Sequence, residues 1–571
     1  MVGDIRKNYG DVVEAGFTDS QLLSDGEFSK LPHTLLKGRP SLLGFSVQIG
    51  ALPHFERMMD ELLKTGSPPS IVAGGFLPTF IGDYLAEKYR GLIVVRGRGE
   101  ESLRGIVNLL LNGSGNLEDI PNLAFQDRNG EVVQTKRKFP ELEVVGLPAM
   151  DFIKEYKQDG IQIGLETSVG CSYGHCSFCD RQAFYDTVTF KPFPIERTID
   201  ILRNFTEFGV SGVNIVDDNF TDCLGLEHQQ QLLHSIIAAK ECGSIDRRIQ
   251  LFPSTRIDGI VSNDRVRDAE LVNLWNLLKR ANTRAVFVGI ESCSLTQRKR
   301  YRKGLSQRQI QRAIGRLREL DIKPEIGFIM FDPEVTPDEL MENVCEIERL
   351  GIGGELSYPF SRLVLRPEIP LLSRMGKLGM LTGNFNPNML SYEYRWQNEQ
   401  SERIYFACRN WGKRSFGLFT AIKDSFRVEN FTGDMHSKLA AALDLSMREF
   451  RQLYLGYLKD CTRFFMCSNS TSKVPVELDA SYDDKVKSLI MNVVFKGISN
   501  ESLFDFTGKV VMEGIIVLLR LNNGSLPLRK AQSYLEHFFG KEKVMIVLNS
   551  LVNNGDVSLV DNNLLVVQPL E

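Results

Sequence analysis

Between residues 161 and 370, short apolar runs alternate with longer amphipathic stretches, and this alternation constrains the fold more than any other feature of the sequence. Each apolar run has the length of a strand, and each stretch between two runs has the periodicity of a helix. Strands joined through helices pair in parallel by right-handed crossovers. We therefore predict an α/β fold, with a partial parallel (β/α)6 barrel favoured over an open sheet. Its six candidate strands are residues 161–167, 212–218, 249–255, 285–291, 324–331 and 355–365.

Residues 1–110 carry a shorter alternation of the same kind. Helical patterns separate three apolar runs there, which predicts a Rossmann-like domain with strands at residues 41–50, 70–76 and 91–97. Residues 111–160 are rich in Gly, Asn, Asp and Pro, so we expect them to connect the two α/β units. Within this segment, the "DRNG" stretch at residues 127–130 predicts a hairpin.

The remainder of the chain has a different pattern. Residues 371–508 show mostly helical periodicity and predict a helical C-terminal region. Residues 509–571 show three helical patterns and then a two-strand hairpin at residues 556–567, around Asp561, Asn562 and Asn563. This order is the outline of a winged helix, so we expect a winged-helix-like segment at this end.

Composition narrows the classes of function. The 571 residues exceed what one hydrophobic core usually supports. A formal net charge of −4 gives no basic excess to draw the chain onto nucleic acid or an acidic membrane. No secretory signal is apparent, and no run of about 18 apolar residues occurs. The ten cysteines lack regular pairing, which indicates a reducing compartment. We predict a cytoplasmic protein without membrane contact, for which nucleic acid is not the expected partner.

Three cysteines, Cys171, Cys176 and Cys179, stand in the spacing C-x4-C-x2-C just after the first barrel strand. Parallel α/β folds carry their chemistry at the carboxyl ends of strands. A structural zinc site closes with four protein ligands, whereas a [4Fe-4S] cluster held by three thiolates leaves one iron open. The triplet therefore predicts an iron–sulfur site. The alternatives are three unrelated free cysteines, or His175 as a fourth ligand, which is disfavoured because it adjoins Cys176.

The stretch "GCSYGHCSFCD" after "GLETSV" resembles the cluster loop of radical S-adenosylmethionine (SAM) enzymes, and the six-strand alternation resembles their partial barrel. The usual family spacing is C-x3-C-x2-C, so this chain carries one additional residue between Cys171 and Cys176. The aromatic Phe178 before the last cysteine matches the family habit. The resemblance implies a [4Fe-4S] cluster on the three cysteines and SAM at its open iron.

Three further stretches, "NIVDDNF", "FPSTRID" and "FVGIESCS", resemble strand ends that contact SAM in this family. Strand-end capping is an equal alternative for the polar residues of the first stretch, and a solvated side chain is an equal alternative for Arg256. A carboxylate between apolar neighbours, as at Glu291, is costly to bury unpaired, which favours function. The resemblance also implies that Lys303 lies near the site. Asp332 stands at a position where this family commonly has a glycine. The resemblance implies SAM contacts from Phe178, Asp217, Asp218, Asn219, Ser254, Arg256, Glu291 and Ser292.

The N-terminal unit, through "IVAGGFLPTF" and "VVRGRGEESL", resembles the cobalamin-binding domain that precedes the barrel in one radical SAM subgroup. Gly74 and Gly75 would allow the backbone to approach cobalamin closely, with an ordinary strand-to-helix turn as the alternative. The sequence contains no D-x-H-x-x-G to supply a histidine ligand. Only three of the roughly five strands of a complete cobalamin domain are recognisable, so a shortened domain is expected.

The resemblance implies that a reduced cluster cleaves SAM to methionine and a 5′-deoxyadenosyl radical, which takes a hydrogen atom from an unactivated carbon of a peptide or natural-product substrate and so leads to its modification. Cobalamin, if bound, implies methyl transfer, so the chain would be a methyltransferase. A flavodoxin or ferredoxin is the expected electron donor. Two alternatives stay open. One is a cobalamin-independent rearrangement or bond formation, and the other is an iron–sulfur sensor that reads DNA through the winged-helix-like segment.

Overall fold

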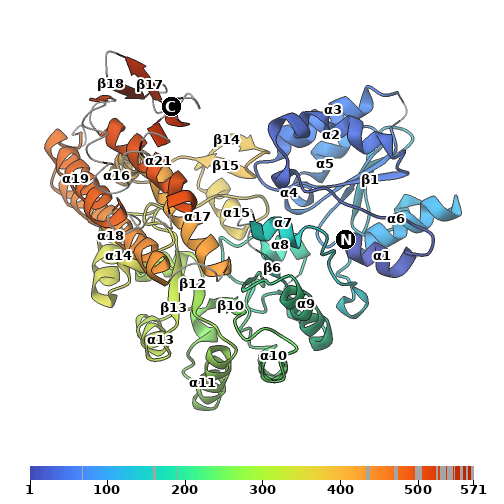
Figure 1. The fold of residues 1–571 in the computed structure, drawn as a ribbon, viewed down its shortest axis with the longest axis horizontal. Coiled ribbons are helices and arrows are strands. Elements are labelled where there is room, and N and C mark those ends of the chain that lie inside the picture. The colour runs from blue at the N-terminus through green and yellow to red at the C-terminus, as the bar shows by residue number, and fades with distance from the viewer. Residues whose placement is uncertain are drawn as a thin grey trace.

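The computed structural model describes residues 1–521 apart from 67, 159–162, 188–189, 433–436, 469–472 and 496–503. Beyond residue 521 it describes residues 525–527, 535, 544, 547–548, 550–552, 557–560 and 563–566. An N-terminal α/β unit (blue), a second α/β unit (green) and a group of C-terminal helices (orange to red) lie side by side (Figure 1). None of the described helices combines the length and apolarity needed to cross a bilayer.

The N-terminal unit is built on one sheet in the order β1-β2-β3-β4-β5. The three predicted strands, β1 (Leu42–Ser46), β2 (Ser70–Gly74) and β3 (Leu92–Val95), are present and parallel. The hairpin expected around residues 127–130 is also present, as β4 (Leu123–Gln126) and β5 (Val132–Gln134). It does more than connect two units, because β4 pairs antiparallel with β3 and widens the N-terminal sheet.

Helices pack on this sheet through apolar positions spaced by helical turns. In α3 (Leu52–Leu63), the buried residues Leu52, Phe55, Met59 and Leu62 lie on one face, and Pro53 stands in the first turn, where a missing N–H costs no hydrogen bond. The other helices that begin after strands of this sheet are α4 (Phe76–Phe80), α5 (Gly82–Lys88) and α6 (Glu100–Asn112). The short α4 follows β2 directly, which places it at the carboxyl edge of the sheet.

The second unit contains two runs of parallel strands. The first run pairs β6 (Gly164–Leu165), β9 (Gly212–Ile215) and β10 (Gln250–Phe252). The second pairs β11 (Ser254–Arg256), β12 (Ala285–Glu291) and β13 (Lys323–Phe328). Only Pro253, which has no N–H to donate, separates β10 from β11, and a parallel bridge from Leu251 to Thr283 joins the two runs.

Helices cover the outer side of these strands (Figure 1). Their bounds are α9 (Ile195–Glu207), α10 (Leu226–Glu241), α11 (Arg265–Arg280), α13 (Gln307–Glu319) and α14 (Pro337–Leu350). The predicted α/β character and parallel pairing are thus present.

The sixth barrel strand, expected at residues 355–365, does not form. The segment instead makes single bridges, from Leu356 to Ile326 and from Arg362 to Phe331. Pro359 removes one donor from this stretch. Phe360 packs against the C-terminal helices, where its ring stacks on that of Tyr454 with centroids 5.0 Å apart. Parallel pairing is therefore limited to these two bridges, and the residues between them pack against the C-terminal helices.

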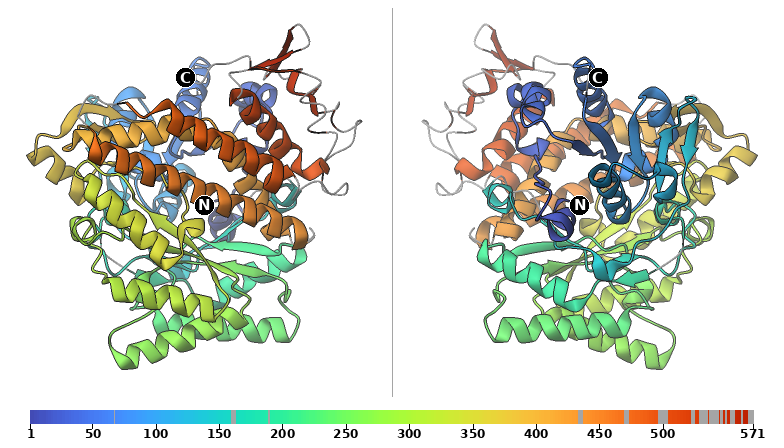
Figure 2. Two further views of the ribbon diagram at one scale, coloured as in Figure 1. Left: turned by 90° about the vertical axis from the view of Figure 1, so that its left-hand side faces the viewer. Right: turned by 90° about the vertical axis from the view of Figure 1, so that its right-hand side faces the viewer.

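After α15 (Pro370–Lys377), the C-terminal region forms an antiparallel hairpin that the sequence did not predict, β14 (Leu381–Asn386) and β15 (Ser391–Tyr394). Its turn reaches the N-terminal unit, because the amide of Leu52 donates to the side chain of Asn388 at 3.0 Å and Leu390 joins the core around α3. The predicted helices follow the hairpin, as α16 (Glu399–Gly412), α17 (Phe416–Thr432), α18 (Ser437–Cys467), α19 (Val476–Leu489) and α21 (Phe504–Arg520). Of these helices, α18 packs beside α14 (Figure 2).

The hairpin predicted at residues 556–567 is present as β17 (Val557–Val560) and β18 (Asn563–Val566), and β16 (Ser525–Pro527) pairs with β18. Most of the expected helical part of the winged-helix-like segment, together with Asp561 and Asn562, lies outside the described residues.

Candidate active site

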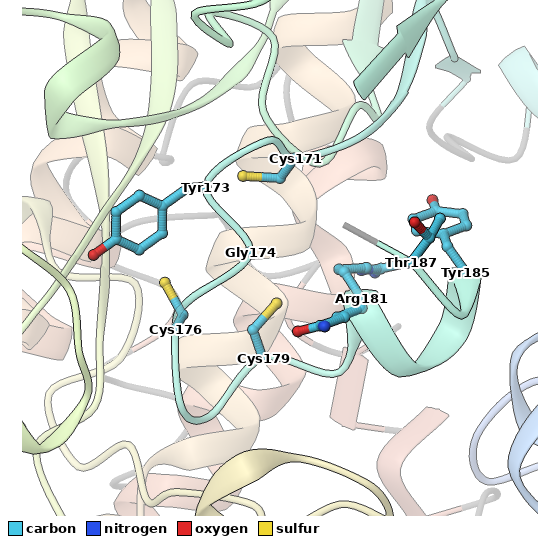
Figure 3. Close-up of a pocket in the computed structure, with 9 residues that line it drawn as sticks. Cys171, Tyr173, Gly174, Cys176, Cys179, Arg181, Tyr185 and Thr187 are labelled. Atoms are coloured by element: carbon cyan, nitrogen blue, oxygen red, sulfur yellow. The ribbon is translucent and has the colours of Figure 1, made fainter. Parts of the chain in front are cut away.

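The three cysteines face one pocket on the loop between β7 (Ser168–Gly170) and α8 (Arg181–Tyr185), and their sulfur atoms point toward the same hollow (Figure 3). The pocket is also lined by Tyr173, Gly174, Arg181, Gln182, Tyr185 and Thr187. Gly170 and Gly174 adopt φ of +89° and +58°, values that favour glycine. These two turns let the longer loop fold back, so the additional residue does not carry Cys171 away from the other two thiols.

The thiols are suited to a metal cluster rather than to free reactivity. Burial raises the pKa of Cys171, and it raises the pKa of Cys179 to about 12. Thiols with a raised pKa keep their protons until a bound metal displaces those protons. In the part of the chain that the structure describes, no three His, Cys, Asp or Glu side chains are grouped as around a single metal ion. Three soft donors spread around a hollow fit the ligand set of an iron–sulfur cluster.

Two aspartates after β9 brace the start of this loop. Asp218 accepts from the amide of Gly170 at 2.9 Å and from the Tyr185 hydroxyl at 2.8 Å, and it forms an ion pair with Arg181 at 3.0 Å. Asp222 accepts from both the amide and the hydroxyl of Ser172, at 2.8 and 2.6 Å. The residues on either side of Cys171 are therefore fixed by carboxylates about 50 positions further along the chain.

Arg256 at the end of β11 reaches the cysteines directly. Its Nη1 donates to Sγ of Cys176 at 3.2 Å, and its guanidinium lies 3.6 Å from the ring centroid of Tyr173. Nη2 also donates to the carbonyl of Lys303 at 3.1 Å. Arg256 is buried, with its charge paired to Asp258 at 2.9 Å. Its placement against a cysteine sulfur favours a functional role over a solvated side chain.

Residues 300–303 support the other end of the cysteine loop. The amide and hydroxyl of Ser177 donate to the carbonyls of Tyr301 and Arg300, at 3.0 and 2.8 Å, and the Tyr173 hydroxyl donates to the carbonyl of Arg302 at 2.7 Å. The ring of Phe178 meets that of Tyr301 edge to face, with centroids 5.5 Å apart. The loop thus rests on a row of backbone carbonyls.

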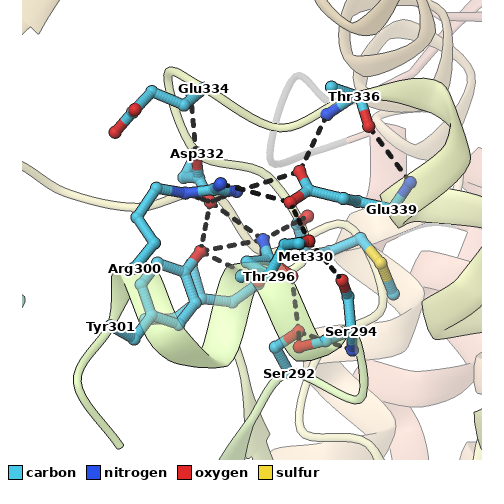
Figure 4. Close-up of polar contacts among 12 residues, drawn as sticks. Ser292, Ser294, Thr296, Arg300, Tyr301, Met330, Asp332, Glu334, Thr336 and Glu339 are labelled. Atoms are coloured by element: carbon cyan, nitrogen blue, oxygen red, sulfur yellow. Dashed lines mark hydrogen bonds and ion pairs between the residues drawn. The ribbon is translucent and has the colours of Figure 1, made fainter.

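This supporting segment is held in turn by Asp332 (Figure 4). Asp332 accepts from the Tyr301 hydroxyl at 2.7 Å and from Arg300 at 3.0 Å, and Arg300 also pairs with Glu339 at 3.0 Å. Burial and the neighbouring Asp332 raise the pKa of Tyr301 well above its ordinary value, so its hydroxyl remains a donor. Asp332 stands where the resemblance leads one to expect a glycine, and in this structure it holds the segment that supports the cysteine loop.

Glu291 stands at an irregularity in β12. Its φ is +69°, and the register between β12 and β13 shifts between Gly289 and Glu291. Its carboxylate pairs with Lys303 at 3.1 Å, and a Cβ added at Gly289 would lie 2.6 Å from that carboxylate and 3.0 Å from the ammonium nitrogen. A non-glycine residue held in this conformation is a local strain of the kind that collects at functional sites.

Other residues predicted to contact SAM instead use their polar atoms in hydrogen bonds to neighbouring protein groups. Asp217 is buried and accepts from the amide and hydroxyl of Thr167 and the hydroxyl of Ser168, at 2.7, 2.5 and 2.6 Å. Asn219 bridges Asp222 and the amide of Arg256, and the buried Ser292 bonds to Gln297 and Asn343. These contacts are those of supporting residues. Ser254 shares a face of β11 with Arg256, since the two are two positions apart.

The two glycines proposed for cobalamin differ in their surroundings. Gly75 has φ of +103°, and a Cβ there would lie 3.0 Å from the carbonyl oxygen of Val47 on the neighbouring chain segment. The protein's own backbone therefore already requires a glycine at position 75. This agrees with the interpretation of Gly75 as part of an ordinary strand-to-helix turn. A Cβ at Gly74 would make only ordinary contacts, at 3.7 Å.

The carboxyl edge of the N-terminal sheet faces the cysteine loop through α4 and α8. Phe76 of α4 stacks on Phe184 of α8, with centroids 5.4 Å apart and planes at 13°. Arg366, which pairs with Asp180 at 2.8 Å, lies over the ring of Phe76. A ligand bound at this edge of the sheet would therefore meet the wall of the cysteine pocket, a placement that fits a cofactor shared by the two units.

Sequence reasoning missed several residues of this site. Arg181, Gln182, Tyr185 and Thr187 line the pocket, and their position just after Cys179 was an available signal. Asp222, Arg300 and Tyr301 had no local signal, because each acts on a part of the loop that is distant in sequence.

Residues 165–344 match the family model described as the Radical SAM superfamily, which confirms the family predicted from the cysteine loop. Over these residues, which include the cysteine loop, the chain is similar to radical SAM enzymes. Its fold is that of OxsB, described as a cobalamin-dependent S-adenosylmethionine radical enzyme and solved with aqua-cobalamin bound: the TM-score is 0.73 at 20% identity, covering 97% of this chain and 81% of OxsB. At this identity the likeness shows the fold alone.

Two further proteins are similar to this chain, one in structure and one in sequence. TsrM from Kitasatospora setae, a radical S-adenosylmethionine methyltransferase solved with cobalamin and a [4Fe-4S] cluster, gives a TM-score of 0.59 at 16% identity, covering 81% of this chain and 96% of TsrM. The 4′-phospho-dehydrooxetanocin synthase of Priestia megaterium is 25% identical over 463 residues, which are 69% of this chain and 60% of that protein. The chain thus spans less than two thirds of this curated relative.

Proposed function

We propose that this chain holds a [4Fe-4S] cluster on Cys171, Cys176 and Cys179, binds SAM at the open iron, and binds cobalamin at the carboxyl edge of β1, β2 and β3. The observation that carries the proposal is the gathering of three half-buried thiols around one pocket, with Arg256 donating to Cys176. A cluster held by these cysteines would supply the electron for reductive cleavage of SAM, and with it radical chemistry at an unactivated carbon.

The protein's own residues would prepare this chemistry by fixing the cofactors. Asp218 and Asp222 hold the chain on either side of Cys171, and the carbonyls of Arg300 and Tyr301 hold Ser177. We propose that Phe178, Ser254, Arg256 and Glu291 face SAM. Asp217, Asn219 and Ser292 would act one layer behind them, since their polar atoms are taken up by neighbouring protein groups.

The substrate is proposed to be a small molecule or peptide, with a flavodoxin or ferredoxin of the cytoplasm as electron donor. OxsB and TsrM are both described with cobalamin, which supports the cobalamin-dependent version of this reaction. TsrM is described as a methyltransferase, so methyl transfer is the first outcome to test.

Anaerobic reconstitution tests the proposal. We expect about four irons per chain, as one cluster held by three thiolates requires, and 5′-deoxyadenosine or methylated product after reduction with dithionite. Cys176→Ala should lose both the cluster absorbance and SAM turnover, whereas Cys345→Ala, at an exposed cysteine of α14, should keep them. Unchanged turnover in Cys176→Ala would sink the proposal. Wild-type protein that shows no cobalamin absorbance after incubation with hydroxocobalamin would leave the cobalamin-independent reaction.

A further inference from the structure

A second pocket lies beside the first, where the end of β3 and the segment after β5 meet α8. Four of its eight lining residues are cations, and none is a carboxylate. Its lining residues are Arg96, Arg98, Asn122, Arg137, Lys138, Phe139, Phe184 and Tyr185. We call this the arginine pocket. Tyr185 lines both it and the cysteine pocket.

Two of the four cations are neutralised by the protein. Arg98 pairs with Glu100 at 2.5 Å and with Glu166 at 2.8 Å, and Lys138 pairs with Glu101 at 2.7 Å. The pair with Glu166 ties the N-terminal unit to the start of the second unit, and the three pairs together account for the charge of two lining residues.

The other two, Arg96 and Arg137, have only neutral hydrogen-bond partners among the described residues. Arg96 donates to the side-chain oxygen of Gln134 at 2.5 Å and to the carbonyl of Thr135 at 3.5 Å, and its buried Nε has no partner. Arg137 donates to the carbonyls of Ala183, at 3.3 Å, and of Phe184. Two guanidinium groups thus share a partly buried pocket without a hydrogen-bonded anion.

The pair is unfavourable as it stands. Burial and the charge of Arg96 lower the pKa of Arg137, while Asp186 and Glu368 oppose this from a distance without hydrogen bonding to it. Bringing like charges together away from water costs free energy unless an anion compensates them. Fixed arginines of this kind are typical of anion sites, because guanidinium groups match the oxygens of phosphate.

The backbone between the arginines is shaped to bring them together. Gly97 has φ of +75°, and a Cβ there would lie 2.8 Å from Nη2 of Arg137 and 3.0 Å from the carbonyl oxygen of Phe184. The Gly97 amide donates to the Thr79 hydroxyl at 2.8 Å, which fixes this turn against α4. Any side chain at this position would push Arg137 away from α8.

We propose that the arginine pocket binds the phosphate group of a phosphate ester, with Arg96 and Arg137 as its ligands. The inference rests on the proposed function for its choice of molecule. The phosphate belongs either to the phosphodiester of the cobalamin nucleotide tail or to a phosphorylated substrate. In either case the shared wall at Tyr185 brings the attached molecule beside the cysteine pocket.

Binding measurements on the full chain test the site. Inorganic phosphate should raise the thermal midpoint of the wild-type protein, and Arg96→Gln and Arg137→Gln should each weaken phosphate binding roughly tenfold, the value of a charged hydrogen bond. Arg128→Gln, on the exposed tip of the β4–β5 hairpin, is the matched control and should bind as the wild type does. Far-UV circular dichroism and iron content establish that each variant is folded. Phosphate that shifts the wild type and both pocket variants equally, or shifts none of them, would overturn the site.

The source of the phosphate is distinguished with cobinamide, which lacks the phosphodiester tail of cobalamin. If Arg137→Gln weakens hydroxocobalamin binding but not cobinamide binding, the phosphate is that of cobalamin. If it weakens neither and abolishes only the phosphate response, the phosphate is that of the substrate. A wild-type chain that binds phosphate through the two arginines but does not bind cobalamin keeps the site while contradicting the proposed cofactor.

Discussion

Arg256 and Cys176 are joined by a hydrogen bond from the guanidinium Nη1 to the sulfur, at 3.2 Å. The arginine ends β11 and the cysteine lies 80 residues earlier, so the bond ties the second α/β unit to the cysteine loop. Hydrogen bonds and charge at the ligating sulfurs are among the quantities that set the potential of an iron–sulfur cluster. In the proposed function, this one contact would therefore connect the fold to the potential of the cluster.

Arg256→Gln should lower the reduction potential of the reconstituted cluster. The reduced cluster carries one more negative charge, and the guanidinium stabilises that state more than the oxidised one. We expect a shift of about 60 mV, which corresponds to a tenfold change for one electron. A redox titration followed by electron paramagnetic resonance measures it. Arg203→Gln, at an exposed ion pair of α9, should leave the potential unchanged. Equal potentials in wild type and Arg256→Gln would contradict this role.

Tyr301→Phe should destabilise the fold and loosen the cysteine loop. It deletes the hydroxyl that Asp332 accepts at 2.7 Å and leaves a buried carboxylate with fewer donors. The expected loss in the free energy of unfolding is about 1–3 kcal/mol. Denaturant unfolding measures it, and the rate at which a chelator removes iron reports on the loop. Tyr84→Phe removes an exposed hydroxyl bound to Glu56 and should alter neither quantity. Iron loss at the wild-type rate in Tyr301→Phe would show that Asp332 does not support the loop.

Local sequence patterns predicted the features of the fold that depend on residues close together in the sequence. The cysteine spacing identified the loop, and the alternation of apolar runs identified the parallel strands of both α/β units. The Asp-Arg-Asn-Gly stretch gave the β4–β5 hairpin, in which the Asp127 carboxylate accepts from the amides of Asn129 and Glu131, both at 2.8 Å.

Contacts between distant parts of the chain could not be predicted in this way. The expected strand at residues 355–365 is interrupted between two bridges, where Phe360 packs on Tyr454, 94 positions later. The partner of Asp222, Ser172, precedes it by 50 residues, and the approach of Arg96 to Arg137 depends on how β4 pairs with both β3 and β5. Single-sequence periodicity reports which face is apolar but not which distant groups meet there.

Gly75→Ala should destabilise the N-terminal unit, whereas Gly74→Ala should be tolerated. An alanine at position 75 would keep φ at +103° and place its Cβ 3.0 Å from the Val47 oxygen, at a cost of about 1–3 kcal/mol. At position 74 the nearest atoms lie at 3.7 Å. Limited proteolysis and thermal unfolding of the two variants make a matched comparison. Two equally stable variants would show that the backbone near Val47 relaxes more easily than its geometry indicates.

Asp217→Asn should change how stability depends on pH. Burial raises the pKa of Asp217 to about 7, against the hydrogen bonds from Ser168 and Thr167 that lower it. Between the unfolded value of 3.8 and about 7, the native state holds a proton that the unfolded state has lost, so stability falls as pH rises through this window. The penalty is complete above about pH 7 and amounts to roughly 4 kcal/mol at most. Asparagine mimics the protonated acid, and the hydroxyls of Thr167 and Ser168 can rotate to suit it.

Relative to the wild type, Asp217→Asn should therefore gain stability at pH 8 and gain little at pH 4.5, as measured by denaturant unfolding at both values. Asp246→Asn provides a control of opposite sign. Its hydrogen bond from Arg248 lowers the pKa of Asp246, so its contribution is present at neutral pH and is lost as pH falls. That variant should lose stability at pH 8 and converge with the wild type in acid. If Asp217→Asn instead loses stability at pH 8, the carboxylate is charged in the native state, and a cation must compensate it in the folded protein.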